Sequence, residues 1–244
     1  MPEEVVKIVE EKKAQLKGYT LIEGFPGLGL VGIICSKYLV EKLKMEEIGY
    51  IDSKNFLPVI RIHKGIPVRP ARIFMDRKKK IAVLLCEQLI LPKVLYALRD
   101  AIVNWTKKKG FSRVISINGI RAEEGISLYG IAANRESLEE LKKHKVEVIE
   151  EGVTTGLTSL LLLAFKDSNI EAFSLLGNVH INADYKASAE VLKKLNEILK
   201  LNVDVRPLMK EAKELEKAIT QHIAKMQSLQ EEEVKRLGHA PMYT

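Results

Sequence analysis

Three closely spaced glycines are the first feature of this sequence that could bind a ligand. They lie in the segment TLIEGFPGLGLVG, where Gly27, Gly29 and Gly32 have the spacing GxGxxG. In a dinucleotide-binding fold this spacing follows a strand and opens a helix whose N-terminus binds the pyrophosphate. An acidic residue about 20 positions further on then binds the ribose, and Asp52 lies near that distance. The motif therefore allows one hypothesis, a nucleotide- or nucleoside-binding enzyme that uses the loop 27–32.

The residues around this motif favour a structural role for its glycines. Gly24, Phe25 and Pro26 stand directly before the motif, and Pro26 lengthens the loop because it holds Phe25 in extended geometry. The segment after Asp52 resembles a hairpin, whereas a dinucleotide fold continues with a second helix. We therefore predict a loop in which glycines permit close packing and unusual dihedral angles. Its residues are Gly24, Pro26, Gly27, Gly29 and Gly32.

Polar residues follow two other predicted strands. Ser116, Asn118 and Arg121 lie at or just after the end of one strand, and Asn178 and His180 lie at or just after the end of another. Such positions often form sites in α/β proteins, so Arg121, Glu123 and His180 could together bind a small anion. Loop caps and turn formers are the favoured interpretation, because no nucleophile is paired with a base. The sequence thus predicts no catalytic residue and no cofactor.

The composition is that of a globular protein. The chain has 244 residues, of which 46% are hydrophobic and 29% are charged. The two cysteines, Cys35 and Cys86, lie in apolar runs, which predicts buried, reduced thiols and a cytoplasmic protein. No metal site is expected, because the sequence has no CxxC or HxxxH pattern. No apolar run reaches the ~18 residues of a membrane span, so no membrane partner is predicted.

The charge pattern does not predict a nucleic-acid partner. The formal charge is +7, but lysines are scattered among glutamates. The basic runs at 77–80 and 107–109 lie where we place a turn and a helix end, and cations are ordinary at the C-terminus of a helix. The sequence also lacks a basic strand with interleaved aromatic residues.

Hydrophobic periodicity predicts alternating helices and strands as far as Leu201. Amphipathic spacing predicts helices over 3–16, 30–44, 93–110, 137–145, 155–168 and 186–201. Apolar or β-branched runs predict strands over 19–25, 46–52, 58–65, 68–76, 80–88, 111–119, 146–151 and 170–178. Buried strands that alternate with helices are typical of a three-layer α/β/α domain, which we place at residues 1–204.

The pattern changes to a heptad repeat after this domain. Apolar positions are separated alternately by four and three residues for about three heptads, and they predict a helix over 207–237. Its seam contains Leu208, Ala212, Leu215, Ile219, His222, Met226 and Leu229. A narrow seam that is polar at His222 favours a coiled extension, residues 205–237, that projects and pairs with other copies of the chain. The alternative is a helix that folds back on its own domain.

The last three residues form a compact docking peptide. Met242 could fill an apolar pocket, while Tyr243 adds ring area and one hydrogen bond. The free carboxylate of Thr244 could pair with a lysine and with backbone donors. Gly238 and Pro241 would separate this tail, residues 238–244, from the helix.

Three segments resemble the proteasome assembly chaperone superfamily. The stretch EGFPGLGLVGIICSKYLVEKL resembles its N-terminal signature, and GVTTGLTSLLLLAF resembles its second glycine-bearing helix. The stretch NVHINADYKASAEVLKKLNEIL resembles its closing segment, although the prolines that many members carry there are replaced by Ala183, Asp184 and Tyr185. The resemblance covers residues 18–204. With the heptad helix and the MYT ending, the sequence is most similar to archaeal homologues of these chaperones.

This resemblance implies a fold and a function. The fold would be an α/β/α sandwich similar to nucleoside phosphorylases, without their catalytic residues. The protein would be a homo-oligomer and not an enzyme, acting as an assembly chaperone or an ATP-independent activator. Its partner would be the α-subunit ring of the proteasome core particle. Met242, Tyr243 and Thr244 would then be the hydrophobic–tyrosine–any-residue element that enters pockets between α subunits.

Overall fold

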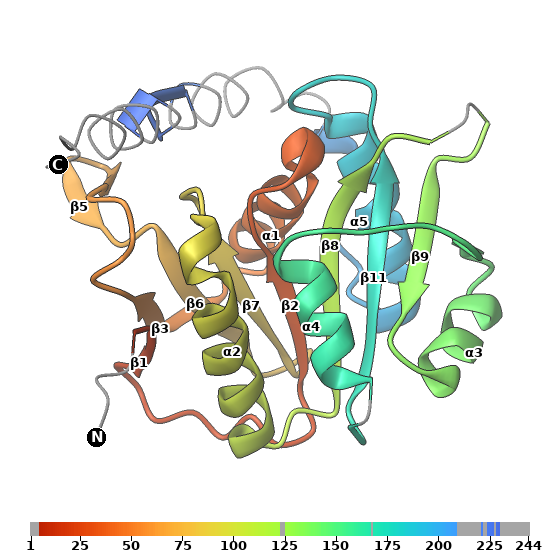
Figure 1. Ribbon diagram of the computed structural model, residues 1–244, viewed down its shortest axis with the longest axis horizontal. Helices are drawn as coiled ribbons and strands as arrows, with labels where there is room; N and C mark the ends of the chain where they lie inside the picture. The colour runs from red at the N-terminus through yellow and green to blue at the C-terminus, as the bar shows by residue number, and fades with distance from the viewer. Residues whose placement is uncertain are drawn as a thin grey trace, which may run out of the picture.

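The computed structural model describes residues 5–122, 125–166 and 168–208, together with residues 221, 224–226, 228 and 229. Within them, one mixed sheet of nine strands runs through the molecule (Figure 1) in the order β1-β3-β6-β7-β2-β8-β11-β9-β10. From one edge to the other, these strands are β1 (Lys7–Glu10), β3 (Glu46–Asp52), β6 (Ala71–Asp76), β7 (Ile81–Cys86), β2 (Thr20–Gly24), β8 (Arg113–Ile120), β11 (Glu171–Asn178), β9 (Leu128–Ala132) and β10 (Glu147–Val148).

The centre of the sheet is parallel and its two sides contain antiparallel pairs. Strands β7, β2, β8 and β11 run in the same direction, whereas β1, β3 and β6 join them through antiparallel pairs. On the other side, β9 is antiparallel to β11 and parallel to β10. Strands β2 and β7 are buried along their whole length, as expected for strands covered on both faces.

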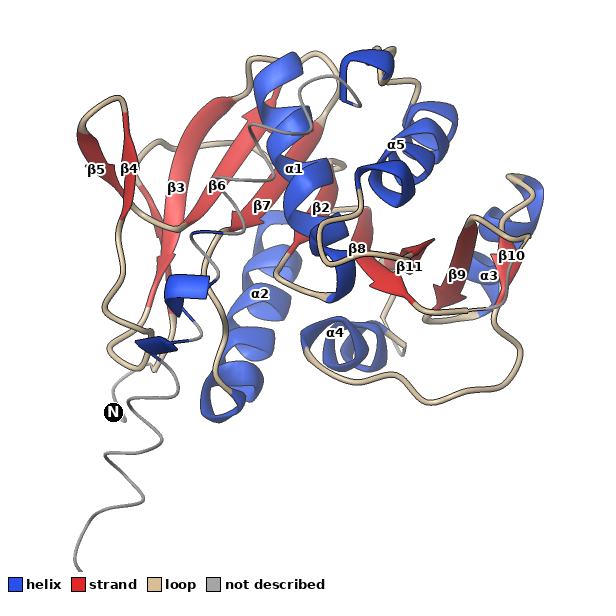
Figure 2. Cartoon of the chain, turned by 90° about the horizontal axis from the view of Figure 1, so that it is seen from above, coloured by secondary structure: helices blue, strands red, loops and turns tan. Residues whose placement is uncertain are grey.

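Helices cover both faces of the sheet (Figure 2). Helices α1 (Val31–Lys42) and α5 (Tyr185–Leu199) pack together on one face, and α2 (Leu95–Lys109) and α4 (Leu157–Phe165) pack together on the other. Helix α3 (Arg135–Lys143) lies beside β9, β10 and β11. Short 3-10 turns, η1 (Leu28–Leu30) and η2 (Pro92–Val94), precede α1 and α2.

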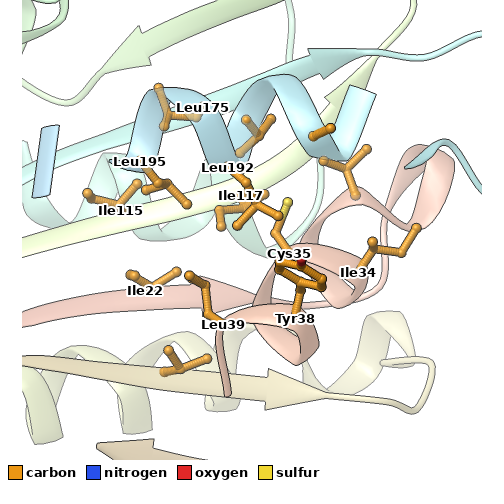
Figure 3. Close-up of a cluster of buried hydrophobic side chains, with 14 of the residues drawn as sticks. Ile22, Ile34, Cys35, Tyr38, Leu39, Ile115, Ile117, Leu175, Leu192 and Leu195 are labelled. Carbon is orange, nitrogen blue, oxygen red and sulfur yellow. The ribbon is translucent and has the colours of Figure 1, made fainter. Parts of the chain in front are cut away.

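Two apolar cores follow from the alternation of side chains along the strands. On β2, Ile22 belongs to the core beneath α1 and α5 (Figure 3), while Leu21 belongs to the core beneath α2 and α4. Phe173 on β11 and Phe165 on α4 are both fully buried, one in each core. Successive residues of a strand point to opposite faces, so each central strand contributes to both cores.

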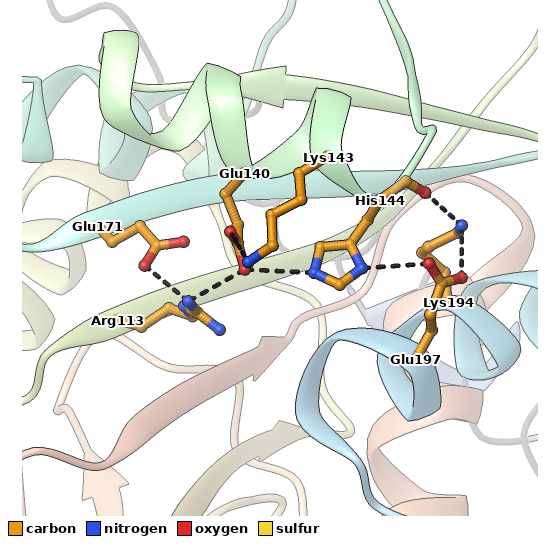
Figure 4. A network of polar contacts seen from close by, with 7 residues as sticks. All are labelled: Arg113, Glu140, Lys143, His144, Glu171, Lys194 and Glu197. Atoms are coloured by element: carbon orange, nitrogen blue, oxygen red, sulfur yellow. Dashed lines mark hydrogen bonds and ion pairs between the residues drawn. The ribbon is translucent and has the colours of Figure 1, made fainter.

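A polar network fixes α3 to α5 and to the sheet (Figure 4). Both ring nitrogens of His144 face carboxylates, with Nε2 3.3 Å from Glu140 and Nδ1 3.1 Å from Glu197. Arg113 on β8 lies 3.3 Å from Glu140 and 2.8 Å from Glu171. These contacts connect α3 to α5 and to strands β8 and β11.

Most predicted elements are confirmed, including the end of α2 at Gly110, whose φ of 71° forms a left-handed cap. Strand β4 (Arg61–His63) lies within the predicted strand 58–65, whereas its hairpin partner β5 (Ile66–Val68) lies mostly where a turn was predicted. The predicted helix over 3–16 is wrong, because residues of β1 pair with the edge of the sheet, for example Lys7 with Asp52. Strand β9 has no counterpart among the predicted strands.

Most of the predicted C-terminal extension and tail lies outside the described residues, including Leu215, Ile219, His222 and residues 242–244. The structure therefore shows no coiled extension. Two predicted seam residues are described as fully buried within this chain, Leu208 in the core of α1 and α5 and Met226 in the core of α2 and α4. Leu229 is half-buried. At Met226, this burial agrees with the fold-back alternative, while a seam between copies of the chain stays a prediction.

Candidate functional site

The predicted glycine loop connects β2 to α1 by close backbone packing. A Cβ atom at Gly32 would lie 2.7 Å from the backbone oxygen of Ile117 and 2.8 Å from that of Phe25. A Cβ at Gly24 would meet the side chain of Ser36 and the backbone of Gly32. Real Cβ atoms do not approach other atoms so closely, so α1 can lie against the sheet only because these positions are glycines.

The same loop is pressed against the segments that follow β8 and β11. Gly29 has a φ of +63°, and a Cβ there would lie 2.6 Å from a methyl group of Val179. The backbone oxygen of Gly29 accepts a hydrogen bond of 2.9 Å from the amide of Asp184. A Cβ at Gly27 would meet the side chain of Asn118. The loop is therefore occupied by the protein itself on the sides where these residues lie.

This geometry does not form a dinucleotide site. In that fold, the second strand neighbours the first and carries the ribose-binding acid. Here β6 and β7 lie between β2 and β3, so Asp52 is three strands away from the glycine loop. Asp52 is exposed and lies 3.6 Å from Arg69 instead. Val179 also fills the space against Gly29 that an approaching pyrophosphate would need.

A cleft of about 670 Å³ lies beside the loop, at the carboxyl ends of β2 and β8. The loop after β2 contributes Phe25 and Leu28 to its wall, and the end of β8 contributes Asn118. Arg121 and the segment 149–158 complete the lining. The sequence pattern placed Asn118 and Arg121 near a possible site, but it gave no sign that residues 149–158 would reach them across the sheet.

The predicted anion pocket is divided in the structure. Arg121 lines the large cleft, whereas His180 lines a separate pocket of about 310 Å³ with Asp184 and Asn178. Glu123 lies outside the described residues. Asn178 holds the loop after β8, because its Oδ1 accepts from Ala122 N at 3.1 Å and its Nδ2 donates to the oxygen of Ile126 at 2.9 Å.

A buried carboxyl group, Glu23 on β2, is a residue that the sequence analysis missed. It is fully buried on the sheet face covered by α2 and α4, directly beside Ser116 on β8. Burial raises the pKa of Glu23 from 4.5 to about 7, although Ser116 and the backbone of Phe25 partly oppose this shift. Neither carboxyl oxygen has a hydrogen bond of normal geometry to a described residue. The sequence did contain a signal for this buried carboxyl group, because Glu23 is a charged residue inside the otherwise apolar strand segment TLIEGF.

The described residues give no other sign of catalytic machinery. Burial raises the pKa of both cysteine thiols, that of Cys86 to about 12, so neither is a reactive thiolate. Among these residues no group of three His, Cys, Asp or Glu side chains could hold a metal ion. Nor does any helix in the described part of the chain have the length and apolarity to cross a membrane.

The fold and the loop thus define a class: a mixed α/β domain whose glycine-bearing turn packs a helix onto the sheet instead of cradling a dinucleotide. Comparison with known proteins identifies the family. Residues 21–223 match the PAC2 family, and the chain belongs to this family. It is 32% identical over 243 residues to the protein MJ0106 of Methanocaldococcus jannaschii, covering 98% of each chain.

Two solved structures from Pyrococcus furiosus share the fold. PbaA, described as an archaeal homolog of proteasome-assembly chaperone, has 30% sequence identity and a TM-score of 0.82, covering 92% of this chain and 99% of PbaA. PbaB, described as an archaeal proteasome activator, has 23% identity and a TM-score of 0.74, covering 89% of this chain and 98% of PbaB. The resemblance to proteasome assembly chaperones that the sequence indicates is therefore confirmed.

Proposed function

We propose that this protein is a non-enzymatic assembly chaperone or ATP-independent activator of the proteasome core particle. The observation that carries this proposal is the similarity to PbaA, which extends over 92% of the chain. The PAC2 match over residues 21–223 and the fold shared with the activator PbaB support it. The glycine loop is consistent with it, because its contacts hold α1 against the sheet and leave no dinucleotide site.

In this proposal the C-terminal tail is the docking element. Met242 enters an apolar pocket between α subunits, Tyr243 adds ring contact and a hydrogen bond, and the carboxylate of Thr244 pairs with a lysine of the ring. A three-residue ligand binds weakly. Binding opens a gate only if the tail prefers the open ring, because a ligand shifts an equilibrium only by its difference in affinity for the two states.

Homo-oligomerisation would supply the missing affinity. Several tethered tails raise the avidity by ~10²- to 10⁴-fold if their spacing matches the pockets of the ring. In the proposal, the helix over 205–237 sets that spacing through contacts between copies, at Leu215, Ile219 and His222. In the proposal, Leu208 and Met226, which are buried in the chain's own cores, contribute by fixing the helix to its domain.

The test measures binding of the full chain to purified α-subunit rings. We compare it with a variant lacking residues 242–244, with Tyr243→Ala, and with Tyr243→Phe as a matched control that keeps the ring. We expect the first two variants to lose binding and Tyr243→Phe to weaken it about tenfold through the lost hydrogen bond. Light scattering coupled to size exclusion should give the same oligomeric state for all four proteins. Undiminished binding without residues 242–244 would exclude the tail as the docking element.

A further inference from the structure

The cleft beside the glycine loop lies at a point where the chain leaves two neighbouring parallel strands in opposite directions. After β2 the chain continues to β3, on one side of the strand order, and after β8 it continues to β9, on the other side. Such a reversal leaves an open crevice outside the carboxyl ends of the two strands, and ligands of open α/β sheets commonly bind there. A volume of about 670 Å³ is within the usual range for small-molecule sites.

The N-terminus of α4 contributes hydrogen-bond donors to this cleft. Gly156, Leu157 and Thr158, at the start of this nine-residue helix, all line the cleft. No side chain caps the helix, so its first backbone N–H groups are available. Gly156 has φ 85° and ψ −163°, a conformation that essentially only glycine adopts. Free N–H groups and the helix dipole together favour an anionic group at this position.

The hydroxyl of Thr158 gives independent evidence for a ligand. Thr158 is only 6% exposed, and it lines the cleft. Among the residues that the structure describes, its hydroxyl has no hydrogen-bond partner. This hydroxyl is not one of the fully buried polar atoms that lack a partner, so it is accessible from the cleft, where an anionic oxygen of a ligand would accept its hydrogen bond. Exposed Arg121, on the same lining, supplies a cation for that anion.

The rest of the lining defines the remainder of the ligand. Phe25, Leu28 and Val153 form apolar parts of the wall. The exposed carboxylates of Glu150 and Glu151 also line the cleft, and they can accept hydrogen bonds from donors such as the hydroxyl groups of a sugar. Inorganic phosphate alone would leave the apolar part of the lining and these carboxylates without a matching group when it binds at the N-terminus of α4. A phosphate, a sugar and a flat apolar base would match all three parts of the lining.

We infer that this cleft binds a nucleoside monophosphate, with its phosphate at the N-terminus of α4, on Thr158 and Arg121. The site differs from a dinucleotide fingerprint, because the phosphate contacts α4 and the loop 27–32 forms only part of the wall. No described residue of its lining belongs to the tail proposed as the docking element, so binding here and docking to the proteasome can be tested separately.

The test is calorimetric titration of the full chain with AMP, adenosine and inorganic phosphate. We expect saturable binding of AMP and affinities at least tenfold weaker for adenosine and for phosphate. Thr158→Val, which removes the hydroxyl at nearly constant shape, and Arg121→Gln should each weaken AMP binding about tenfold. Arg135→Gln is the matched control. It removes an exposed arginine at the start of α3, which follows the end of β9 beside the start of β11, and it is not part of the cleft lining. This variant should leave the affinity unchanged.

Three results would overturn the inference. The first is the absence of saturable heat at about 10 mM AMP, a concentration that would detect even a weak site. The second is adenosine binding as tightly as AMP, which would remove the phosphate from the site. The third is unchanged AMP affinity of Thr158→Val, with a thermal midpoint that shows the variant to be folded.

Discussion

Arg72 and Glu87 form an ion pair inside the sheet, with Nη2 of the arginine 2.8 Å from Oε2 of the glutamate. Both side chains are nearly buried, at 9% and 6% exposed. The other oxygen of Glu87 lies 3.1 Å from Nε of Arg61 on β4. One carboxylate therefore joins β6, the end of β7 and the β4–β5 hairpin, and this hairpin extends from the sheet in Figure 2.

Breaking this buried pair should destabilise the protein strongly. We expect Arg72→Met to lower the free energy of unfolding by about 3–5 kcal/mol, because it leaves Glu87 with less compensation in a buried position. Urea denaturation followed by circular dichroism measures this change. The matched control is Arg77→Met, since Arg77 pairs with Glu46 at 3.5 Å but is 67% exposed, and its change should stay below about 1 kcal/mol. Equal effects of the two substitutions would contradict the argument.

The glycine loop gives a second prediction. Gly29→Ala adds a Cβ atom at a positive φ and against Val179, so we expect a loss of about 2–4 kcal/mol in the free energy of unfolding. Gly65→Ala is the matched control, because Gly65 has a φ of +79° but no atom within 4 Å of the added Cβ. That variant should lose only about 1 kcal/mol from backbone strain. If both variants lose the same amount, close packing at Gly29 contributes nothing.

The sequence predicted the local elements better than their pairing. Periodicity identified α2 and its end at Gly110, because a helix and its cap depend on neighbouring residues. It predicted a helix over 3–16, because the competing interaction of β1 with β3 joins residues about 40 positions apart, and spacing within one segment does not report such a contact.

For the candidate site too, local sequence patterns identified single residues but not the contacts between distant segments. Asn118 and Arg121 were identified by their position at or just after the end of a strand, and both line the cleft. Residues 149–158 were read as a strand end and a helix start, and nothing local placed them opposite the glycine loop. Glu23 was overlooked because burial, which shifts its pKa, is a property of the folded sheet.

The network around His144 should make stability depend on acid pH. Hydrogen bonds from Lys194 and His144 lower the pKa of Glu197. Burial raises the pKa of Glu140, but Lys143, Arg113 and His144 more than offset it, so that this pKa is also lowered. A lowered carboxyl pKa gives stability that is present above the usual value near 4.5 and is lost as the pH falls through the folded value.

Replacing His144 should weaken this dependence. In His144→Leu both carboxylates lose their contact with the ring, so we expect the loss of stability between pH 5 and pH 3 to be smaller than in the unmodified protein. Urea midpoints at several pH values measure the slope. His63→Leu is the control, because His63 is exposed on the β4–β5 hairpin and should leave the slope unchanged. A slope that is identical in His144→Leu would show that the network does not couple folding to protons.

Glu23 should produce the opposite dependence at higher pH. Its pKa is raised from 4.5 to about 7, so the folded state holds a proton that the unfolded state releases between these values. Its contribution to stability is therefore complete below about pH 4.5 and is lost as the pH rises through 7. The shift corresponds to roughly 3 kcal/mol between pH 4.5 and 8.

Glu23→Gln keeps the shape and removes the titration, so its free energy of unfolding should change less over this interval. The difference between the two pH profiles, measured by urea denaturation at pH 5 and pH 8, isolates Glu23 from groups such as Glu197, whose effects are common to both proteins. The exposed Glu147→Gln should follow the unmodified profile. Parallel profiles for Glu23→Gln and the unmodified protein would mean that Glu23 is charged in the folded state at neutral pH.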